Sequence, residues 1–298
     1  MEIIRAKFET VWRGLQVIFA QGIISMQMNY PKLVTQTTST GASERFVWPN
    51  SIPGMTKWES DAQFARFTAG GMEVINDWYQ DGLEVLQEDI DDDRFNVLGP
   101  RVTMLAQEGE LTKERLVFKL INNGFTNALS LAYDGQFFFD TDHQDGNGPI
   151  QSNKGTAALS ATSFSAARVQ MRSVVDEHRN PVGVKPTILL VPPALEDVAN
   201  QIVTAEYGVS GASNIYFESV QVIVSSYLTS PTAWFLIDSS RAFKPFVLQQ
   251  REPLQLVESP EFDEEMFMRR VRRIRASWRG GVGYALWHFA YGSTGTGP

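Results

Sequence analysis

Three polar residues near the middle of the chain could bind a catalytic metal ion. Asp140, Asp142 and His143 follow one another closely, and Asp134 stands a short distance before them. Carboxylate and imidazole groups are the ligands used by hydrolytic metal sites. In a strand, however, Asp140 and Asp142 would share one face while His143 would point to the other. Metal ligands must converge, so this spacing argues against a metal-dependent hydrolase, which is kept as the alternative from the enzyme class.

No other stretch predicts catalysis. His178 and His288 lie in no recognisable motif. The chain contains no nucleophile elbow, phosphate-binding loop or dinucleotide fingerprint. It also contains no cysteine, which excludes disulfides, zinc ribbons and thiol nucleophiles and fits a reducing cytoplasm. We therefore expect a protein that is not an enzyme and that needs no cofactor.

The acidic run from Asp89 to Asp93 is a second candidate cation site. It lacks the ligand spacing and the glycine of a calcium-binding loop. The run stands just before a predicted long helix, where carboxylates complement the positive end of the helix dipole. A solvated or arginine-paired helix start is therefore the better interpretation.

The most charged stretch could bind DNA phosphates. It contains six arginines: Arg269, Arg270, Arg272, Arg273, Arg275 and Arg279. Alternation along a strand would place Arg273 on one face and Arg270 and Arg272 on the other, whereas a phosphate-binding stripe needs one face. The net charge of -8 also argues against a nucleic-acid-binding surface. Acidic partners are available at 261–265 and 89–93, so we predict salt bridges within or between subunits, with a DNA-binding protein as a second alternative.

Composition indicates a folded globular chain. The 298 residues are 43% hydrophobic and 20% charged, enough for one elaborate domain or two ordinary ones. No apolar run approaches the roughly 20 residues needed to span a bilayer. The N-terminal 23 residues are interrupted by charges, so they do not form a signal peptide.

The element that must position the rest is a long helix predicted over about 94–123. Its apolar residues recur at steps of three and four: Leu98, Val102, Leu105, Leu116 and Leu120. Gly124 provides the left-handed residue that commonly ends a helix. Gly99-Pro100 and Gly109 are its weak points, where the helix could start late or kink.

The N-terminal third is expected to form an arm and a projecting hairpin. Residues 3–19 form an amphipathic helix that packs on protein, with a membrane-surface helix as the alternative. Residues 29–43 form an extended arm. A strand near residue 46 and a second strand over 72–90 enclose two prolines, which predicts a long hairpin. The hairpin carries large side chains that it cannot bury by itself, in Trp48, Met55, Trp58, Phe64, Phe67, Trp78 and Tyr79. Such residues are enriched at protein interfaces, although an ordinary domain core stays open as the alternative.

The second half predicts a compact sheet-and-helix unit. We expect a turn and a short aromatic strand between Tyr133 and His143, then a helix over 160–177. The apolar run 186–193 has the composition of a fully buried strand and leads into another helix. Three more strands are expected near 220–224, 234–237 and 246–249, and the chain is expected to end in a Gly/Thr tail.

Five motifs together resemble a known family. They are SERFVWPNSIPGMTKW, EDIDDD, YDGQFFFDTDH, LLVPPALEDVA and GVGYALWHFAYGS, and they occur in the family's order from about Tyr30 onward. In these motifs the chain resembles the major head subunits of phage Mu and its prophage relatives (gpT). The resemblance implies an α+β fold of the Hong Kong 97 type and a major capsid protein that self-assembles into an icosahedral head around packaged double-stranded DNA.

The resemblance also implies a division of the chain and a set of partners. The expected parts are an N-terminal arm (1–42), an extended loop (43–80), a peripheral domain with the spine helix (81–155), an axial domain (156–244) and peripheral return strands with a C-terminal tail (245–298). The partners are copies of the same chain in pentamers and hexamers, a portal, a decoration protein and a scaffolding protein. Because the arm begins at Met1, scaffolding is expected to be a separate protein. We expect DNA to be enclosed without sequence-specific binding, no membrane contact, and assembly in the bacterial host cytoplasm before residence in the virion. The predicted subunit-interface residues are Trp48, Met55, Trp58, Phe64, Phe67, Arg270, Arg272 and Arg273.

Overall fold

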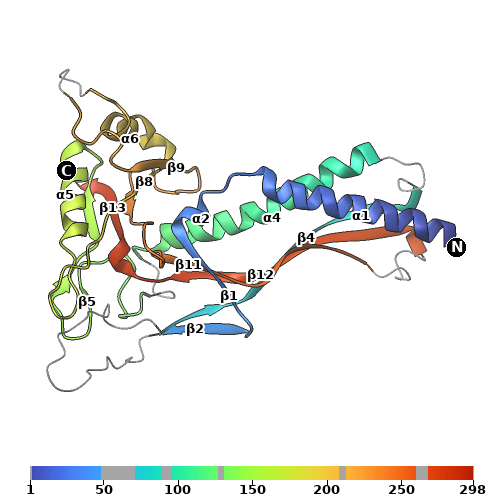
Figure 1. Cartoon of the computed structure of the whole chain (residues 1–298), viewed down its shortest axis with the longest axis horizontal. Helices are drawn as coiled ribbons and strands as arrows, with labels where there is room; N and C mark the ends of the chain where they lie inside the picture. Colours follow the sequence, from blue (N-terminus) through green and yellow to red (C-terminus); the bar gives the residue numbers. More distant parts are fainter. Residues whose placement is uncertain are drawn as a thin grey trace.

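The chain folds into an elongated module and a second module at one end of it (Figure 1). The structure, a computed structural model, describes residues 2–47, 71–88, 95–126, 131–207, 213–259 and 268–297. Five predicted interface residues lie outside this part of the chain: Trp48, Met55, Trp58, Phe64 and Phe67.

The long helix α4 (Phe95–Asn123) runs the length of the elongated module, within one residue of its predicted start. It continues through Pro100, where the missing N–H removes one backbone hydrogen bond. The Thr103 hydroxyl donates to the Gly99 carbonyl oxygen at 3.1 Å in the same turn. The predicted weak points therefore do not interrupt the helix.

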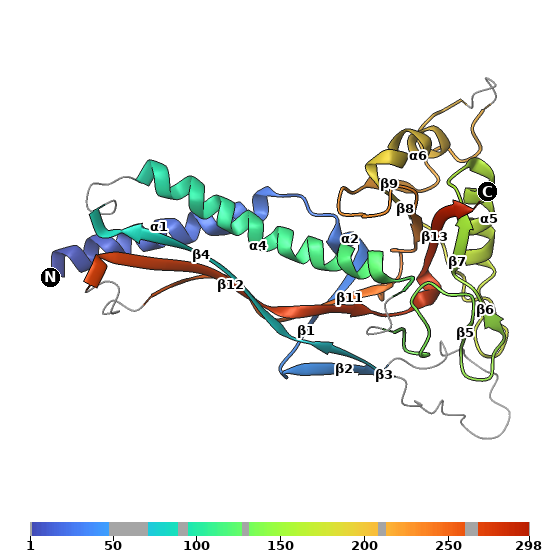
Figure 2. The same cartoon turned by 180° about the vertical axis from the view of Figure 1, so that it is seen from behind.

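Helix α1 (Glu2–Ser25) lies beside α4 and runs in the same direction (Figure 2). Its buried residues Val11, Leu15 and Phe19 share one hydrophobic cluster with α4 and the sheet below. At Gly22 a β-carbon would lie 2.9 Å from the Ala106 Cβ, so this glycine permits close helix contact. The prediction that this amphipathic helix packs on protein is confirmed. In the described part of the chain, no helix is long and apolar enough to cross a membrane.

A four-stranded sheet packs against the two helices. In spatial order its strands are β1 (Val34–Thr38), β11 (Phe246–Glu258), β12 (Val271–Tyr284) and β4 (Asp77–Leu86). The β1–β11 pair is parallel, and the other pairs are antiparallel. Leu256, Ile274 and Ala276 face the helices and complete the cluster with α1 and α4.

Two predicted extended segments are interrupted. The arm contains a short helix, α2 (Tyr30–Leu33), because the Glu114 carboxylate on α4 accepts the backbone N–H groups of Asn29 and Tyr30 at 3.1 and 2.8 Å. The strand predicted over 72–90 breaks at Asn76, whose side chain donates to the Ser39 hydroxyl at 2.8 Å. The result is two strands with different partners. Strand β3 (Gly71–Ile75) pairs with β2 (Ser43–Val47), and β4 pairs with β12.

The second module is built on a five-stranded sheet. In spatial order its strands are β7 (Lys154–Ala157), β13 (Ala290–Gly297), β10 (Trp234–Ile237), β8 (Ile188–Val191) and β9 (Gln221–Val224). Its helices are α5 (Ala161–Arg172) and α6 (Glu196–Val203), the latter after a short 3-10 turn, η1 (Pro193–Leu195). Every residue of β8 and β10 is buried, as the continuous apolar run at 186–193 predicted for β8.

The C-terminal residues correct the prediction of a Gly/Thr tail. They form β13, which lies between β7 and β10 inside the second module. Small residues are needed there, since a β-carbon at Gly292 would lie 2.8 Å from the Phe139 ring. Residues 290–297 therefore belong structurally with the 154–237 unit, away from the β11–β12 strands that precede them.

The aromatic strand predicted between Tyr133 and His143 is also wrong. This segment is formed of turns and bends, and the structure assigns strand only from His143, in β5 (His143–Gln144), which pairs with β6 (Ile150–Gln151). Phe138 and Phe139 are consecutive and both fully buried, and each packs against different rings. Phe138 stacks on Tyr284 at 4.6 Å between ring centroids, and Phe139 contacts Phe235 at 5.2 Å.

Glu114 gives a pH-dependent prediction for the contact between the arm and α4. Burial raises its pKa above 4.5, although the N–H groups of Tyr30 and Asn29 act in the opposite direction. Its contribution to the free energy of unfolding is thus full below pH 4.5 and is lost as the pH rises through the raised pKa. Glu114→Gln removes this titration. Between pH 4.5 and about pH 7 the melting temperature should fall less in the variant than in the unmodified chain.

The control is Glu108→Gln, because Glu108 lies on the same helix but its side chain is 42% exposed. Calorimetry across this pH range measures both variants. Parallel melting-temperature profiles for Glu114→Gln and the unmodified chain would contradict the assignment of this pH dependence to Glu114.

Candidate functional site

The charged stretch of β12 lies on the long sheet with alternating exposure. Ile274 and Ala276 are buried towards the helices, whereas Arg273 and Arg275 are exposed on the opposite face. No described helix covers this outer face in either view of the chain (Figures 1 and 2). The predicted separation of the arginines onto two faces is confirmed for the residues within the strand.

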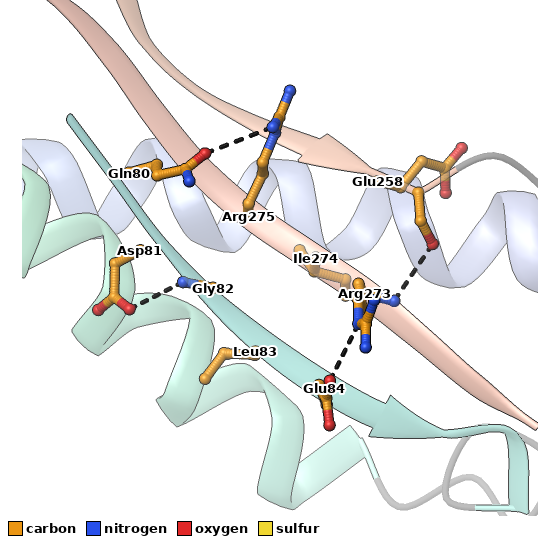
Figure 3. Close-up of a pocket in the computed structure, with 10 residues that line it drawn as sticks. Gln80, Asp81, Gly82, Leu83, Glu84, Glu258, Arg273, Ile274 and Arg275 are labelled. Carbon is orange, nitrogen blue, oxygen red and sulfur yellow. Dashed lines mark hydrogen bonds and ion pairs between the residues drawn. The ribbon is translucent and has the colours of Figure 1, made fainter. Parts of the chain in front are cut away.

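The exposed arginines are paired within the subunit. Arg273 Nε lies 2.9 Å from the Glu84 Oε1 on β4, and Arg275 Nη1 donates to the Gln80 side chain at 3.4 Å (Figure 3). Further along β12, the Arg279 Nη1 lies 3.9 Å from a Glu252 oxygen. The predicted acidic partners at 89–93 and 261–265 lie outside the described residues, so their pairing with the arginines stays a prediction.

Arg272 and Arg270 occupy different environments. The Arg272 side chain is buried, and its Nε donates to the Gln87 Oε1 at 3.0 Å. Arg270 is exposed, has a φ of 55°, and accepts the Gln87 backbone N–H at 2.8 Å. The interface role of Arg270, Arg272 and Arg273 stays a prediction.

A groove of about 630 Å³ crosses the outer face between β4, β12 and the end of β11. Figure 3 shows its lining, in which Glu84 pairs with Arg273 and Gln80 with Arg275. Its charged residues are Asp81, Glu84, Glu258, Arg273 and Arg275. A surface that binds a phosphate backbone gathers positive charge, whereas this lining has both signs. The groove therefore fits a polar protein contact better than DNA.

The three candidate metal ligands do not converge. Asp140 lies 4.0 Å from the Lys154 ammonium, Asp142 is exposed, and His143 is fully buried with its Nδ1 2.6 Å from the Asp134 Oδ2. Among the residues that the structure describes, no group of three or more His, Asp or Glu side chains is arranged to bind a metal ion.

The structure instead reveals a buried polar cluster that the sequence did not predict. The Asp145 carboxylate accepts the Tyr133 hydroxyl and contacts His288 Nε2 at 2.5 Å. His288 comes from η2 (Trp287–Phe289), just before the last strand, so its partner lies far away in sequence. No local pattern could have found this pair, because its two residues are 143 positions apart in the sequence.

Sequence comparison identifies the family. The sequence model described as "Mu-like prophage major head subunit gpT" matches residues 8–158, 152–228 and 229–296, nearly the whole chain. The chain belongs to this family. The resemblance stated from the five motifs is thereby confirmed, and the chain is a major capsid protein of the Mu-like type.

Two curated relatives agree with this assignment. The Mu-like prophage FluMu major head subunit of Haemophilus influenzae is 28% identical over 280 residues, covering 93% of this chain and 70% of that protein. The major capsid protein of Escherichia phage Mu is 23% identical over 283 residues, covering 94% of this chain and 70% of that protein.

Solved structures show the same fold. The procapsid of bacteriophage JBD30 matches with a TM-score of 0.62 and 23% identity, covering 97% of this chain and 75% of that chain. The virus-like particle from Pyrococcus furiosus matches with a TM-score of 0.54 and 13% identity, covering 94% of this chain and 97% of that chain. The predicted α+β fold of the Hong Kong 97 type is confirmed.

Two neighbouring arginines on β12 are predicted to contribute differently to the stability of the subunit. Arg272→Ala removes a buried guanidinium and should lower the free energy of unfolding by about 1–3 kcal/mol. Arg273→Ala removes a pair whose side chains are 46% and 63% exposed, so the loss should stay below about 1 kcal/mol. Chemical denaturation of both variants measures the difference. Equal losses would contradict the assignment of Arg272 to the interior and Arg273 to the surface.

Proposed function

We propose that this capsid subunit closes into an icosahedral shell of pentamers and hexamers and performs no catalytic step. The observation that carries the proposal is the family match over nearly the whole chain, on a fold shared with a procapsid and a virus-like particle. The alternative function, a metal-dependent hydrolase, is not supported, because Asp140, Asp142 and His143 lie in different environments and do not converge. The mixed charge of the outer groove likewise favours protein contacts over a DNA-binding role.

The elongated module supplies surfaces for contact with other copies. Its sheet has helices on one face, and strand β4 stands at the sheet edge with most of its residues exposed. Trp78 on this strand is 54% exposed, and the Arg279 guanidinium lies 5.1 Å from its ring centroid. An aromatic residue beside a charged rim is typical of protein–protein contact surfaces. We assign this edge and the outer face to contacts between copies.

The division of the chain follows the family. We assign 1–42 to the arm, 43–80 to the extended loop, 81–155 to the peripheral domain and 156–244 to the axial domain. The antiparallel β2–β3 pair supports a loop that leaves and returns at one place. The position of β13 leads us to group residues 290–297 with the axial unit, and to leave the β11–β12 strands with the peripheral domain.

Other partners follow from the capsid assignment. We propose a separate scaffolding protein, a portal and a decoration protein, with assembly in the host cytoplasm and final residence in the virion. The shell would enclose double-stranded DNA without sequence-specific contacts. The net charge of -8 supports this last point, because a chain devoted to phosphate binding would be basic.

Electron microscopy of the purified chain, with and without a chelator, tests the proposed function. We expect uniform closed shells whose number and diameter do not change with EDTA, because assembly is built on protein contacts. Shells that dissolve in EDTA would contradict the absence of a metal requirement. Particles that never close, whatever the concentration of the chain or of a co-expressed scaffold, would contradict the assembly proposal.

A tryptophan pair tests the proposed loop contact. Trp48 and Trp58 lie outside the described residues, and the sequence places both on the projecting loop. If the loop lies across a neighbouring copy, the double change Trp48→Ala, Trp58→Ala should spare the isolated subunit's melting temperature. Shell yield should collapse, because each truncated anchor commonly costs about 2 kcal/mol or more.

The control is Trp278→Ala, which removes a tryptophan that is 1% exposed in the core and should lower the subunit's melting temperature. Wild-type shell yield from the double variant, or its unfolding, would assign the two loop tryptophans to an internal core.

A further inference from the structure

The base of the proposed extended loop lies on the outer face of the long sheet. This base is the antiparallel pair β2–β3, and both views show it on the opposite side of β12 from α4 (Figures 1 and 2). Met72 and Val74 of β3 are buried in the larger hydrophobic cluster, whereas Glu73 between them is exposed. One side of β3 therefore packs on its own subunit.

Two glycines of β12 allow β3 to lie this close to the sheet. The Tyr284 hydroxyl donates to a backbone carbonyl oxygen of α4 at 2.8 Å, so alternation places Gly281 and Gly283 on the outer face. A β-carbon at Gly281 would lie 2.2 Å from the Ile75 carbonyl oxygen. One at Gly283 would lie 2.7 Å from the Val74 Cγ2. Glycine in a strand permits this kind of close approach by a second backbone.

Buried amide groups fix the point at which the chain passes from β4 to β3. Gln249 lies opposite Gly281 in the β11–β12 register, and its Nε2 donates to the Asn76 Oδ1 at 2.7 Å. The Asn76 Nδ2 donates in turn to the Ser39 hydroxyl at 2.8 Å and to the Gly41 carbonyl oxygen at 3.0 Å. Asn76 and Gln249 are both buried. Displacement of the chain at Asn76 would therefore leave buried polar atoms unpaired, which is costly.

The turn that leads into β2 belongs to the same network. The Glu44 Oε1 accepts the backbone N–H groups of Thr40 and Gly41 at 3.0 and 3.1 Å. It also accepts the Ser39 hydroxyl at 3.0 Å. The Arg251 side chain on β11 donates to the Gly41 carbonyl oxygen at 2.5 Å. Both strands of the β2–β3 pair are thus attached to the long sheet at the same end.

We propose that Asn76, Gln249 and Gly281 are positioning residues that orient the base of the extended loop on its own subunit before a neighbouring copy binds. This inference rests on the proposed assembly function and names the contacts that prepare the subunit for it. A segment that is already oriented loses less conformational freedom on association, so a larger fraction of free subunits is competent to assemble. Contacts between copies then use an existing orientation of β2–β3.

The distance between two spin labels tests this orientation directly. The chain contains no cysteine, so Glu73→Cys on β3 and Lys119→Cys on α4 provide two exposed attachment sites without further changes. In the unassembled full-length chain we expect one narrow distance distribution. Adding Asn76→Ala should broaden it, because the amide contacts that hold the base are lost while β2 and β3 still pair with each other.

The same change should impair assembly. In a concentration series of the unlabelled chain followed by electron microscopy, Asn76→Ala should need about tenfold more subunit to form shells, since only the oriented fraction assembles. Circular dichroism checks that the variant is folded. The matched control is Asn147→Ala, which replaces an exposed asparagine of the second module and should leave both measurements unchanged.

A pair of glycine variants provides an independent test. Gly281→Ala should displace β3 and shift the label distance, because its methyl group would meet a backbone oxygen. Gly99→Ala on α4 is the control, since its β-carbon would lie 3.5 Å from the Ile18 Cδ1, an ordinary contact. If either Asn76→Ala or Gly281→Ala does not fold, the other variant decides the question.

Three results would count against these assignments. A broad distribution in the unmodified chain, or an unchanged distribution in the folded variants, would overturn the positioning role. A broadened distribution with an unchanged assembly concentration would overturn it as well, because the orientation would then have no use in assembly. Failure of the unmodified chain to form shells would instead contradict the proposed function, and the label distances would still show whether the base is fixed.

Discussion

The structure depends on one helix that is shared between two hydrophobic cores. The first half of α4 contributes Leu98, Val102 and Leu105 to the cluster formed with α1 and the long sheet. Its second half contributes Val117, Phe118 and Ile121 to the larger cluster, which continues into the five-stranded sheet. Because all of these side chains are buried, neither module can complete its core without the same helix. A single rigid element thus sets the length of the subunit and the position of the second module.

The packing on α4 leaves the opposite side of the sheet available for other copies. Both long helices lie on one face, and Gly22 permits their close contact. The outer face keeps Arg273 paired with Glu84, so its charges are held in place without being buried. Surface pairs of this kind contribute little to folding, about 1 kcal/mol or less, and their position favours recognition over stability.

Local sequence patterns predicted those helices and strands in which buried residues recur at regular steps. The steps of three and four gave the start of α4 to within a residue, the continuous apolar run gave β8, and alternation along β12 separated Arg273 from Arg272. Elements fixed by distant partners were missed. The α2 turn depends on Glu114, β13 depends on the aromatic rings that exclude larger residues at Gly292, and His288 depends on Asp145. Of the interface residues predicted from sequence, Arg272 is buried in its own subunit, and the role of Arg270 and Arg273 depends on neighbouring copies.

Coupled unfolding is the most direct test of the shared helix. Ile121 is fully buried, so Ile121→Ala should reduce the free energy of unfolding by about 2–5 kcal/mol. Denaturant titration with pulsed hydrogen exchange reports separately on α1, at the far end of the elongated module, and on β8 in the second module. If α4 joins the two cores, both segments lose protection at one midpoint, and the variant lowers that midpoint equally for both. Separate midpoints, with a change confined to β8, would show that the cores are independent and would contradict this account.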